Sequence, residues 1–556
     1  MDFKEQLIKL IKKEVKSDFN LEIPPSQELG DFALPCFSLA KELKTNPVEI
    51  AKQLSKKFSA NFIEKVEVKG PYINFFLKKS SFIETIIPKS LEKDFGKEKQ
   101  GKKILVEFPS PNTNKPLHLG HARNIALGIS ISRILEFLGN KVVKVNLNND
   151  RGIHICKSML AYKLFGKNKK PNKKSDHFVG DFYVLFSKWA EKDKSLEDKA
   201  QEMLRLWESG DKSTVALWKK MNSWALNGFK ETYKKFNLEF DKVYNESDFY
   251  DKAKNIIQEY VKKGLFKVDD DGSTIIDLEP YNLGKKVLIR ADGTSIYITQ
   301  DLYLAMQKYK DFKMDKSVYV VGSEQIHHFK VLLKIFELMK LPFAKSCYPI
   351  HYGLVYLPSG KMKSREGTVV DADDILSEIE SLAKKEITKR YQKLPKKEIE
   401  ERSKIIGMAA LKFYLLKSDT VSDIHFNPEE SISFEGETGP YVQYTIARIN
   451  SILKKLGKDI KKADLSLLKT QEEFQIAKLI SDFPSVVKES GEKLKPYLIA
   501  RLLLELSKLF NSYYQSTQIL NQEESLRNSR ILLIKAVKNI LVTGLGLLGI
   551  ESLEEM

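Results

Sequence analysis

One stretch near residue 100 constrains the fold of this chain more than any other. KILVEF (103–108) is a short apolar run with β-branched residues, which predicts a buried strand. IALGISISRILEFLG (125–139) has apolar residues at helical spacing, and KVVKVNLNND (141–150) predicts a second strand. A strand, a helix and a strand in this order form a βαβ unit, in which the strands run parallel. We therefore expect a multidomain α/β protein built around a Rossmann-like, doubly wound parallel sheet.

The regions on either side of this sheet predict two further domains. Residues 1–98 combine helical stretches with an alternating segment, KVEVKGPYINFFL (65–77), and predict a small N-terminal α+β domain. Residues 99–400 hold the parallel sheet, interrupted by a Lys-rich helical insertion at about 165–240. Residues 401–556 show helical spacing throughout and predict an all-α C-terminal bundle.

Three later segments continue the strand pattern of the central domain. They are KVLIRADGTSIYIT (286–299), SVYVVGSEQ (317–325) and IHYGLVYL (350–357). In doubly wound sheets, ligands bind outside the carboxyl ends of the strands. The residues that directly follow the strands are therefore the first candidates for a site.

The chain carries a large positive charge and few cysteines. Its 92 Lys and Arg against 74 Asp and Glu give a formal net charge of +18, with a sequence pI of about 9.2. This excess favours a polyanionic partner, although a Lys-rich surface that only binds water would have the same composition. Cys36, Cys156 and Cys347 are too far apart for a zinc or disulfide framework and favour a reducing compartment. No apolar run reaches 18 residues, so we expect a cytoplasmic protein without a membrane span.

The turn SPNTNKPLHLGHARN (110–124) follows the first strand and opens the helix. A helix N-terminus presents free N–H groups and a positive dipole end, which suit phosphate. His118 and His121 can donate hydrogen bonds to phosphate oxygens, and Lys115 adds a positive charge. Gly120 allows a ligand to approach the backbone closely. The alternatives are a metal pair, for which no third ligand lies at a useful spacing, or a chance pairing of histidines.

A second Gly-flanked segment, SGKMKSREG (359–367), follows the strand GLVYL (353–357). Its candidate phosphate-binding residues are Lys361, Met362, Lys363, Ser364 and Arg365. An exposed basic loop without a ligand would have the same composition. The turn and the loop together indicate a nucleotide site more strongly than either does alone.

These two segments resemble the paired ATP-binding signatures of class I aminoacyl-tRNA synthetases. The wider sequence resembles the arginyl-tRNA synthetase family over essentially the whole chain. The matching segments are SPNTNKPLHLGHARN (110–124), YITQD (297–301), GSEQIHHF (322–329), GPYVQYTIARI (439–449), GDFA (30–33) and the terminal LLGI (547–550). One departure is that the loop at 361–365 reads K-M-K-S-R where the class pattern is K-M-S-K-S. In the family, the lysine at the place of Lys115 would supply the displaced charge.

The resemblance implies that residues 99–400 form a class I catalytic domain. Such an enzyme activates L-arginine with ATP and transfers it to the terminal ribose of tRNA(Arg), releasing pyrophosphate and AMP. Mg²⁺ accompanies the ATP, and no zinc is expected. His118 and His121 would bind phosphate oxygens, while Lys115 and the basic loop would stabilise the departing pyrophosphate.

The resemblance also implies an arginine-binding set, which comprises Asn112, Glu246, Tyr297, Asp301 and Gln325. Asp301 and Glu246 are the acids that we match to the guanidinium group. Tyr297 lies four residues before Asp301, on the same side if the segment is helical. Asn112 and Gln325 would hold the α-amino and carboxylate groups. Taken singly, each of these residues could equally be a surface acid or a core aromatic.

Four other polar residues near the predicted strands have weaker claims. Glu107, on the edge of the first strand, is a further candidate for the arginine site. His327, His328 and His351 are assigned to the scaffold, because a histidine near a sheet edge is more often a hydrogen-bonded structural residue than a catalyst.

The C-terminal bundle contains a candidate RNA-binding face. Tyr441, Tyr444 and Arg448 fall at positions i, i+3 and i+7 of one helix, and aromatic residues with Arg can stack on unpaired bases. The two tyrosines could equally pack inside the bundle. The resemblance implies that this bundle reads the anticodon and that the N-terminal domain, with Asp31 and Phe32, contacts the tRNA elbow.

Several alternatives stay open at this stage. A class I synthetase for lysine or cysteine would keep both ATP signatures, and a small nucleotidyltransferase would share the HLGH turn but be much shorter. A non-catalytic RNA-binding relative would be expected to lose His118, Gly120 and His121. We expect a monomer, although the residues do not determine the oligomeric state. Activation that requires tRNA is carried over from the family as a hypothesis.

Overall fold

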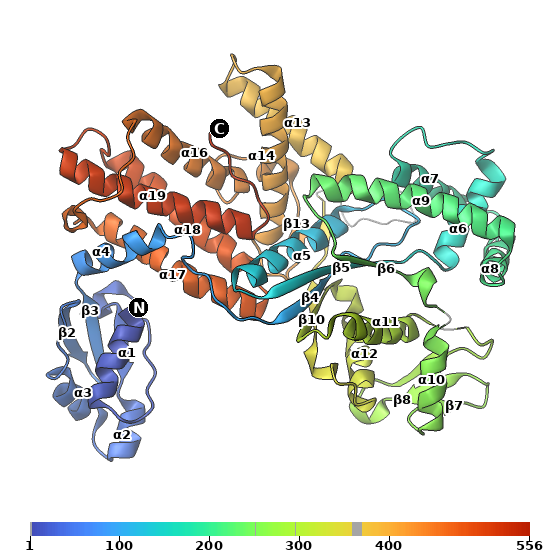
Figure 1. The fold of residues 1–556 in the computed structure, drawn as a ribbon, viewed down its shortest axis with the longest axis horizontal. Coiled ribbons are helices and arrows are strands. Elements are labelled where there is room, and N and C mark those ends of the chain that lie inside the picture. Colours follow the sequence, from blue (N-terminus) through green and yellow to red (C-terminus); the bar gives the residue numbers. More distant parts are fainter. Residues whose placement is uncertain (1–2, 251, 295, 358–369) are drawn as a thin grey trace. The chain divides into compact units, whose positions relative to one another are not determined.

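The computed structural model describes residues 3–250, 252–294, 296–357 and 370–556 (Figure 1). The chain divides into two compact units, each built from several segments. Unit 1 contains Met1–Phe95, Thr445–Pro484 and Glu505–Leu541. Unit 2 contains Gly96–Tyr444, Ser485–Leu504 and Val542–Met556. Along the described ranges, none of the helices combines the length and apolar character needed to cross a bilayer.

A five-stranded parallel sheet forms the centre of unit 2 (Figure 1). Its strands are β4 (Lys103–Glu107), β5 (Lys141–Asn148), β6 (Lys242–Asn245), β10 (Lys316–Gly322) and β11 (Cys347–Tyr352). Their order is β11-β10-β4-β5-β6, so the chain crosses over the sheet in both directions from β4. The apolar side chains of β4 are buried, as expected for a central strand of a parallel sheet. This arrangement confirms the predicted doubly wound fold.

The helix α5 (Leu119–Phe137) connects β4 to β5 and is buried along most of its length. Arg123 near its start is fully buried, and its guanidinium group donates to the carbonyl oxygens of Gly353 (2.6 Å) and Thr420 (3.1 Å). These hydrogen bonds connect the start of α5 to the residue after β11 and to the loop between α14 (Lys396–Leu416) and β13 (Ile424–His425).

The remainder of unit 2 covers and extends this sheet. The helices of the insertion region are α6 (Ile153–Phe165), α7 (Ser175–Ala190), α8 (Ser195–Glu208) and α9 (Lys212–Lys235), which share their own apolar core. A small antiparallel sheet contains β7 (Lys267–Val268), β8 (Thr274–Asp277) and β9 (Lys285–Ile289), and α10 (Lys252–Lys262), α11 (Tyr297–Phe312) and α12 (Ile326–Leu338) lie close to it in sequence. Beyond residue 370 follow α13 (Ala372–Arg390), α14 (Lys396–Leu416), α15 (Pro428–Ser431) and the pair β12 (Val355–Tyr356) and β13 (Ile424–His425).

All three later strand predictions were too long. The segment 317–325 is a strand only to Gly322, since a short 3-10 helix covers Ser323–Gln325. The segment 286–299 is a strand only to Ile289, because a tight turn follows and α11 begins at Tyr297. The segment 350–357 is not continuous either, since β11 ends at Tyr352 and β12 pairs with β13 in a separate sheet. Gly353 marks the break, where a Cβ atom would lie 2.4 Å from the carbonyl oxygen of Ser422.

Unit 1 combines a small α+β domain with helical segments from the C-terminal part of the chain. Its antiparallel sheet has the order β1-β3-β2, formed by β1 (Phe32–Pro35), β2 (Ile63–Lys69) and β3 (Tyr72–Leu77), with α1 (Phe3–Glu14), α2 (Phe37–Leu43), α3 (Pro47–Ser55) and α4 (Lys79–Ser90). Asn46 is the N-cap of α3, with its side chain accepting from Val48 N–H. Parts of four later helices also belong to unit 1, while the rest of each belongs to unit 2: α16 (Gly439–Leu456), α17 (Gln471–Lys493), α18 (Tyr497–Ser516) and α19 (Glu524–Leu547).

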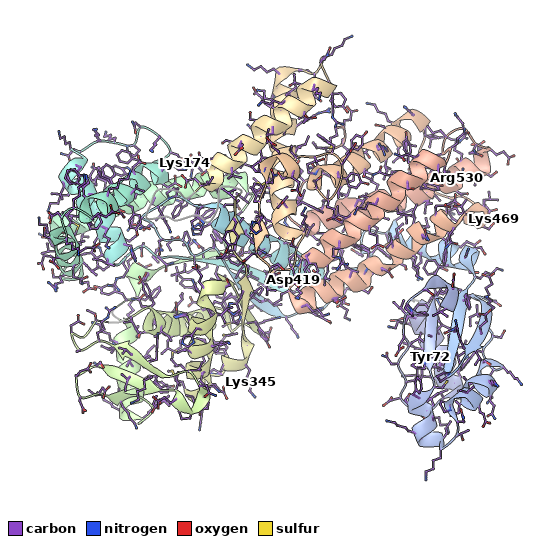
Figure 2. All side chains as sticks on the ribbon, turned by 180° about the vertical axis from the view of Figure 1, so that it is seen from behind. Tyr72, Lys174, Lys345, Asp419, Lys469 and Arg530 are labelled. Atoms are coloured by element: carbon purple, nitrogen blue, oxygen red, sulfur yellow. The ribbon has the colours of Figure 1, made fainter. Side chains whose placement is uncertain are left out.

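The helical part of unit 1 is held together by a buried polar network. Glu473 on α17 is fully buried and accepts hydrogen bonds from Arg530 Nε (3.0 Å), labelled in Figure 2, and from the Tyr513 hydroxyl (2.9 Å). Because these donors satisfy the buried carboxylate, three helices are tied to one another at a single point.

Candidate active site

A cavity of about 560 Å³ opens at the carboxyl ends of the parallel strands. Glu107 at the end of β4, Asn149 just beyond β5 and Gly322 at the end of β10 all line it. Seven residues that the sequence proposed for the site line the same cavity: Asn112, His118, His121, Glu246, Tyr297, Asp301 and Gln325. Residues up to 213 positions apart in the sequence thus meet where the doubly wound fold predicts a ligand.

The HLGH turn forms a histidine capping box at the start of α5. The side chain of His118, the N-cap residue, accepts a hydrogen bond at Nδ1 from Gly120 N–H (3.1 Å). His121 Nδ1 accepts from the backbone N–H of His118 (3.1 Å). Because both Nδ1 atoms are acceptors, the ring proton of each neutral histidine is on Nε2, which is left to donate to a ligand. At Gly120 a Cβ atom would lie 3.0 Å from the His118 ring, so a glycine fits this box best.

Burial keeps this histidine pair uncharged. Desolvation, followed by the nearby charge of Lys115, lowers the pKa of His118 to about 3. The pKa of His121 is well below its usual value, first because of burial and then because of His118 and Lys115. Burial also lowers the pKa of Lys115, while Glu324 acts in the opposite direction. This end of the cavity therefore offers neutral N–H donors and a helix N-terminus, with Lys115 nearby but not in the lining, a combination suited to an anion.

The other end of the cavity holds a buried acid. Glu246 is 4% exposed, and its Oε2 atom has no hydrogen-bond partner among the described residues. Burial raises the pKa of Glu246 to about 8, with Asp150 and Asp301 adding to the effect and Arg151 opposing it. Such a carboxyl is neutral in the empty cavity and becomes charged when a cation approaches.

Asp301 and Tyr297 lie one turn apart at the start of α11. The sequence predicted that these two residues lie on the same side if the segment is helical, and the segment is the start of a helix. Tyr297 is 60% exposed, so its ring is accessible. Asp301 Oδ2 lies 2.6 Å from His328 Nε2, and His328 itself lines the cavity. The assignment of His328 to the scaffold missed this contact, because nothing in the sequence indicates that α12 brings the residue next to α11.

Other cavity residues also escaped the sequence analysis. They include Asn124, His154, Gln300, Glu324 and Tyr352. Asn124 Nδ2 donates to the carbonyl oxygen of Val320 (2.8 Å) and to the Tyr352 hydroxyl (3.2 Å). The only available signal was their position: Asn124 closes the HLGHARN segment, and Glu324 directly precedes Gln325.

The basic loop proposed from the sequence lies outside the described residues. This applies to Lys361, Met362, Lys363, Ser364 and Arg365. The chain is described again from Val370, whose carbonyl oxygen accepts from Leu119 N–H (3.3 Å). Ala372 N–H donates to the carbonyl oxygen of Leu117 (2.8 Å). The segment after the loop thus lies alongside the HLGH turn.

The residues proposed to contact tRNA lie outside this cavity. The Asp31 carboxylate accepts from Leu77 N–H (2.9 Å) and pairs with Lys478 (3.2 Å), and Phe32 begins β1. Tyr441, Tyr444 and Arg448 are half-buried on α16. Arg448 hydrogen-bonds Asn511 and lies over the ring of Tyr514.

Three family models match consecutive parts of the chain. Residues 1–77 match the arginyl tRNA synthetase N terminal domain, residues 85–428 the tRNA synthetases class I (R) catalytic domain, and residues 442–556 the DALR anticodon binding domain. The catalytic-domain match includes every described residue that lines the cavity.

Comparisons of whole chains point to the same family. Proteins described as arginine–tRNA ligase from Treponema denticola and Borrelia hermsii are 44% and 42% identical to this chain. The alignments cover 98% and 96% of this chain and 96% and 94% of those proteins. The structure of Thermus thermophilus arginyl-tRNA synthetase superposes with a TM-score of 0.86 at 27% identity, covering 100% of this chain and 99% of that one. The chain belongs to the arginyl-tRNA synthetase family.

Proposed function

We propose that this chain attaches arginine to tRNA(Arg) in two ATP-dependent steps, both carried out at the cavity described above. The observation that supports this most strongly is the opposite character of the two ends of the cavity. One end holds a buried carboxyl group with one unpartnered oxygen, which suits a guanidinium, and the other holds neutral N–H donors at a helix N-terminus that suit phosphate.

At the acidic end, Glu246 and Asp301 bind the guanidinium group of L-arginine. Arg side chains prefer carboxylates in planar, paired contacts, and the exposed ring of Tyr297 offers an aromatic face. Asn112 and Gln325 hold the α-amino and carboxylate groups. This orientation points the substrate carboxylate toward the HLGH turn, since Asn112 lies six residues before His118 and lines the same cavity.

At the opposite end, the Nε2–H groups of His118 and His121 donate to phosphate oxygens of ATP. In the first step a carboxylate oxygen of arginine attacks the α-phosphorus and pyrophosphate leaves, so negative charge moves onto the departing oxygens. Preorganised neutral donors stabilise this charge without a proton transfer. Lys115 and the basic loop at 361–365 add positive charge. No covalent enzyme intermediate is required.

Mg²⁺ fits the phosphate end of the cavity. This ion is usually held by phosphate oxygens, waters and one or two carboxylates. Glu324 is the carboxylate on this side of the cavity, close enough to Lys115 to raise its pKa against the effect of burial. Glu324 would hold the ion, which supplies positive charge at the phosphate oxygens. The proposal requires no zinc.

The N-terminal and helical domains, with the boundaries proposed from the sequence, make the RNA contacts. The N-terminal domain (1–98) contacts the tRNA elbow through Asp31 and Phe32, and the helical domain (401–556) reads the anticodon. Tyr441, Tyr444 and Arg448 stack on or pair with its bases. The net charge of +18 favours this polyanion. We further propose that the protein acts as a monomer in the cytoplasm.

ATP–pyrophosphate exchange with each of the twenty amino acids, with and without tRNA, tests the proposal. Exchange is expected with arginine alone and only when tRNA is present. Exchange with lysine would support class I activation chemistry but would refute the assignment of Glu246 and Asp301 to the guanidinium group of arginine. Folded protein that is silent under all conditions would support a non-catalytic RNA-binding role instead.

A further inference from the structure

A group of charged side chains lies outside the cavity, where the helical insertion meets the segment after residue 370. Lys174, labelled in Figure 2, precedes α7, and Asp176 and His177 are in its first turn. Asp371 is the N-cap of α13, and Asp373 lies in its first turn. We call these five residues, which have no part in the steps described above, the α7–α13 cluster.

The cluster is held by ion pairs with little solvent access. Lys174 Nζ lies 2.7 Å from Asp176 and 2.9 Å from Asp373. The side chains of Asp176 and Asp373 are 0% and 8% exposed. Asp373 also accepts from Lys235 Nζ (2.7 Å) and from the Thr232 hydroxyl (2.9 Å), both on α9. The Asp373 carboxylate on α13 thus joins the segment that precedes α7 to the helix α9.

The geometry could be taken for a metal site, since ligand atoms of Asp176, His177 and Asp373 all lie within 4.8 Å of one another. The Lys174 ammonium, however, contacts both carboxylates and occupies the place of the cation. At Gly228 on α9, a Cβ atom would lie 2.2 Å from Asp176 Oδ1, so the helix is shaped around this buried acid. The cluster is therefore complete without a metal ion.

His177 connects the cluster to the start of α13. Its Nδ1 lies 3.3 Å from Asp371, while its Nε2 faces Asp373 at 3.7 Å, an ion-pair distance without a hydrogen bond. The cluster holds three carboxylates, and among the described residues the ammonium groups of Lys174 and Lys235 pair with two of them. A protonated His177 supplies the third positive charge, and Asp373 is the main cause of the raised pKa of His177.

The same segment contacts the HLGH turn through the backbone. Asp371 and His118 form an antiparallel bridge, flanked by the Val370–Leu119 and Ala372–Leu117 hydrogen bonds (3.3 and 2.8 Å). The helix α7 also approaches this turn directly, because a Cβ atom at Gly180 would lie 2.6 Å from Cδ of Pro116. Residues 370–372 therefore connect the cluster, which includes Asp371, to His118, the N-cap residue of α5.

We infer that Lys174 and His177 are positioning residues for ATP: by holding Asp371 and Asp373, they fix the segment 370–372 against the HLGH turn and so set the position of the His118 ring. This inference rests on the proposed binding of phosphate by His118. It gives the insertion a role in the first step of the reaction, although none of the five cluster residues lines the cavity.

The test compares His177→Gln with the wild-type protein and with Lys173→Met as a matched control. Glutamine keeps a polar side chain without the charge, and Lys173 forms only an exposed pair with Asp181 in this region. We expect His177→Gln to raise the KM for ATP in arginyl-tRNA formation about tenfold and to weaken directly measured ATP binding to the same degree, since small displacements of an oriented group have large effects. The KM for arginine and all parameters of Lys173→Met should stay within about twofold of wild type.

A pH series adds a readout that simple destabilisation would not give. The charged groups around His177 are Lys174 and Asp176 beside it, Asp371, Asp373 and Asp374 from α13, and Lys235 from α9. Because the pKa of His177 is raised above 6.5, its charged form is complete below that pH and is lost as the pH rises through the raised value. Because burial raises the pKa of Asp371 to about 6, this partner of His177 takes up a proton at lower pH. The difference in ATP affinity between wild type and His177→Gln should therefore be largest from about pH 6 to the raised pKa of His177 and shrink toward alkaline pH.

Lys174→Met serves as the second variant, with an effect at least as large as that of His177→Gln. Because it leaves two buried carboxylates without their shared cation, its folding is checked first, and the conclusion depends on His177→Gln if it does not fold. An unchanged ATP affinity in folded His177→Gln would overturn the inference, as would equal losses in ATP and arginine affinity. Wild-type protein that binds ATP but charges no tRNA would instead refute the proposed function, and the binding measurements would still decide this inference.

Discussion

The two ends of the cavity use burial in opposite ways. At one end burial raises the pKa of Glu246 to about 8, and at the other it lowers the pKa of His118 to about 3. Both groups are therefore neutral in the empty protein at pH 7. The difference lies in what each can become: the carboxyl can lose its proton when a cation arrives, whereas the histidines are fixed as neutral donors by the capping box of α5.

This contrast separates two ways of recognising charge. The arginine end depends on a change of protonation that the substrate itself induces, so its affinity should depend on pH. The phosphate end depends on fixed dipoles and on N–H groups of histidines that stay neutral near pH 7, so the pH dependence expected there is the one carried by His177. The following predictions, from the largest effect to the smallest, test that division.

Asp301→Asn should have the largest effect. Removal of one partner of a charged, hydrogen-bonded pair costs about 2–5 kcal/mol, so kcat/KM for arginine should fall about 10²- to 10³-fold while the KM for ATP changes less than about twofold. Steady-state aminoacylation measures both constants, with the exposed Asp270→Asn as the control. An equal loss in ATP affinity would show that the two ends do not act independently.

His121→Asn should lower kcat about 10²-fold and leave the KM for arginine unchanged, because one donor to the developing phosphate charge is lost. Asparagine can still accept the N–H of His118, so the capping box and the thermal unfolding temperature should be preserved. His121→Ala should show the same kinetic loss together with a helix destabilised by about 1 kcal/mol. If only His121→Ala lost activity, the histidine would be a cap and nothing more.

Arginine binding should release a proton, and arginine affinity should rise about tenfold between pH 7 and pH 8.5 as Glu246 loses its proton more easily. The sign for stability is the reverse. Because the pKa of Glu246 is raised in the folded protein, the stability that this group contributes is complete below about pH 4.5 and is lost as the pH rises through about 8. The arginine-free protein should therefore become less stable over this pH range. Calorimetry in two buffers measures the proton, and Glu246→Gln should abolish both effects.

His328→Asn should raise the KM for arginine about threefold to tenfold, since the hydrogen bond that orients Asp301 is lost while its charge remains. The neighbouring His327 is exposed and lies outside the cavity, so His327→Asn is a matched control. Equal effects of the two substitutions, or none for either, would contradict a positioning role for His328.

Much of the fold followed from local pattern. The βαβ unit at 103–150, the hairpin at 65–77 and the helical C-terminal region all rest on hydrophobic periodicity, and all are present. The failures occurred where chain neighbours do not decide the structure. The segment 286–299 is apolar and β-branched, yet Tyr297 opens a helix because the packing of α11 on the sheet outweighs local propensity.

The chemistry of the site divides in the same way. The sequence by itself determined the HLGH turn at a helix start and the basic composition of the loop, because motif spacing and residue type suffice for these, whereas the candidate acids Glu246 and Asp301 came from the resemblance to the family. Only the tertiary structure decided that Glu246 is buried with its Oε2 atom unpartnered, that His328 contacts Asp301 and that Lys174 and His177 reach the segment beside His118. The physical reason is that desolvation and contacts between distant segments depend on how the whole chain is packed, and no local pattern in the sequence encodes that packing.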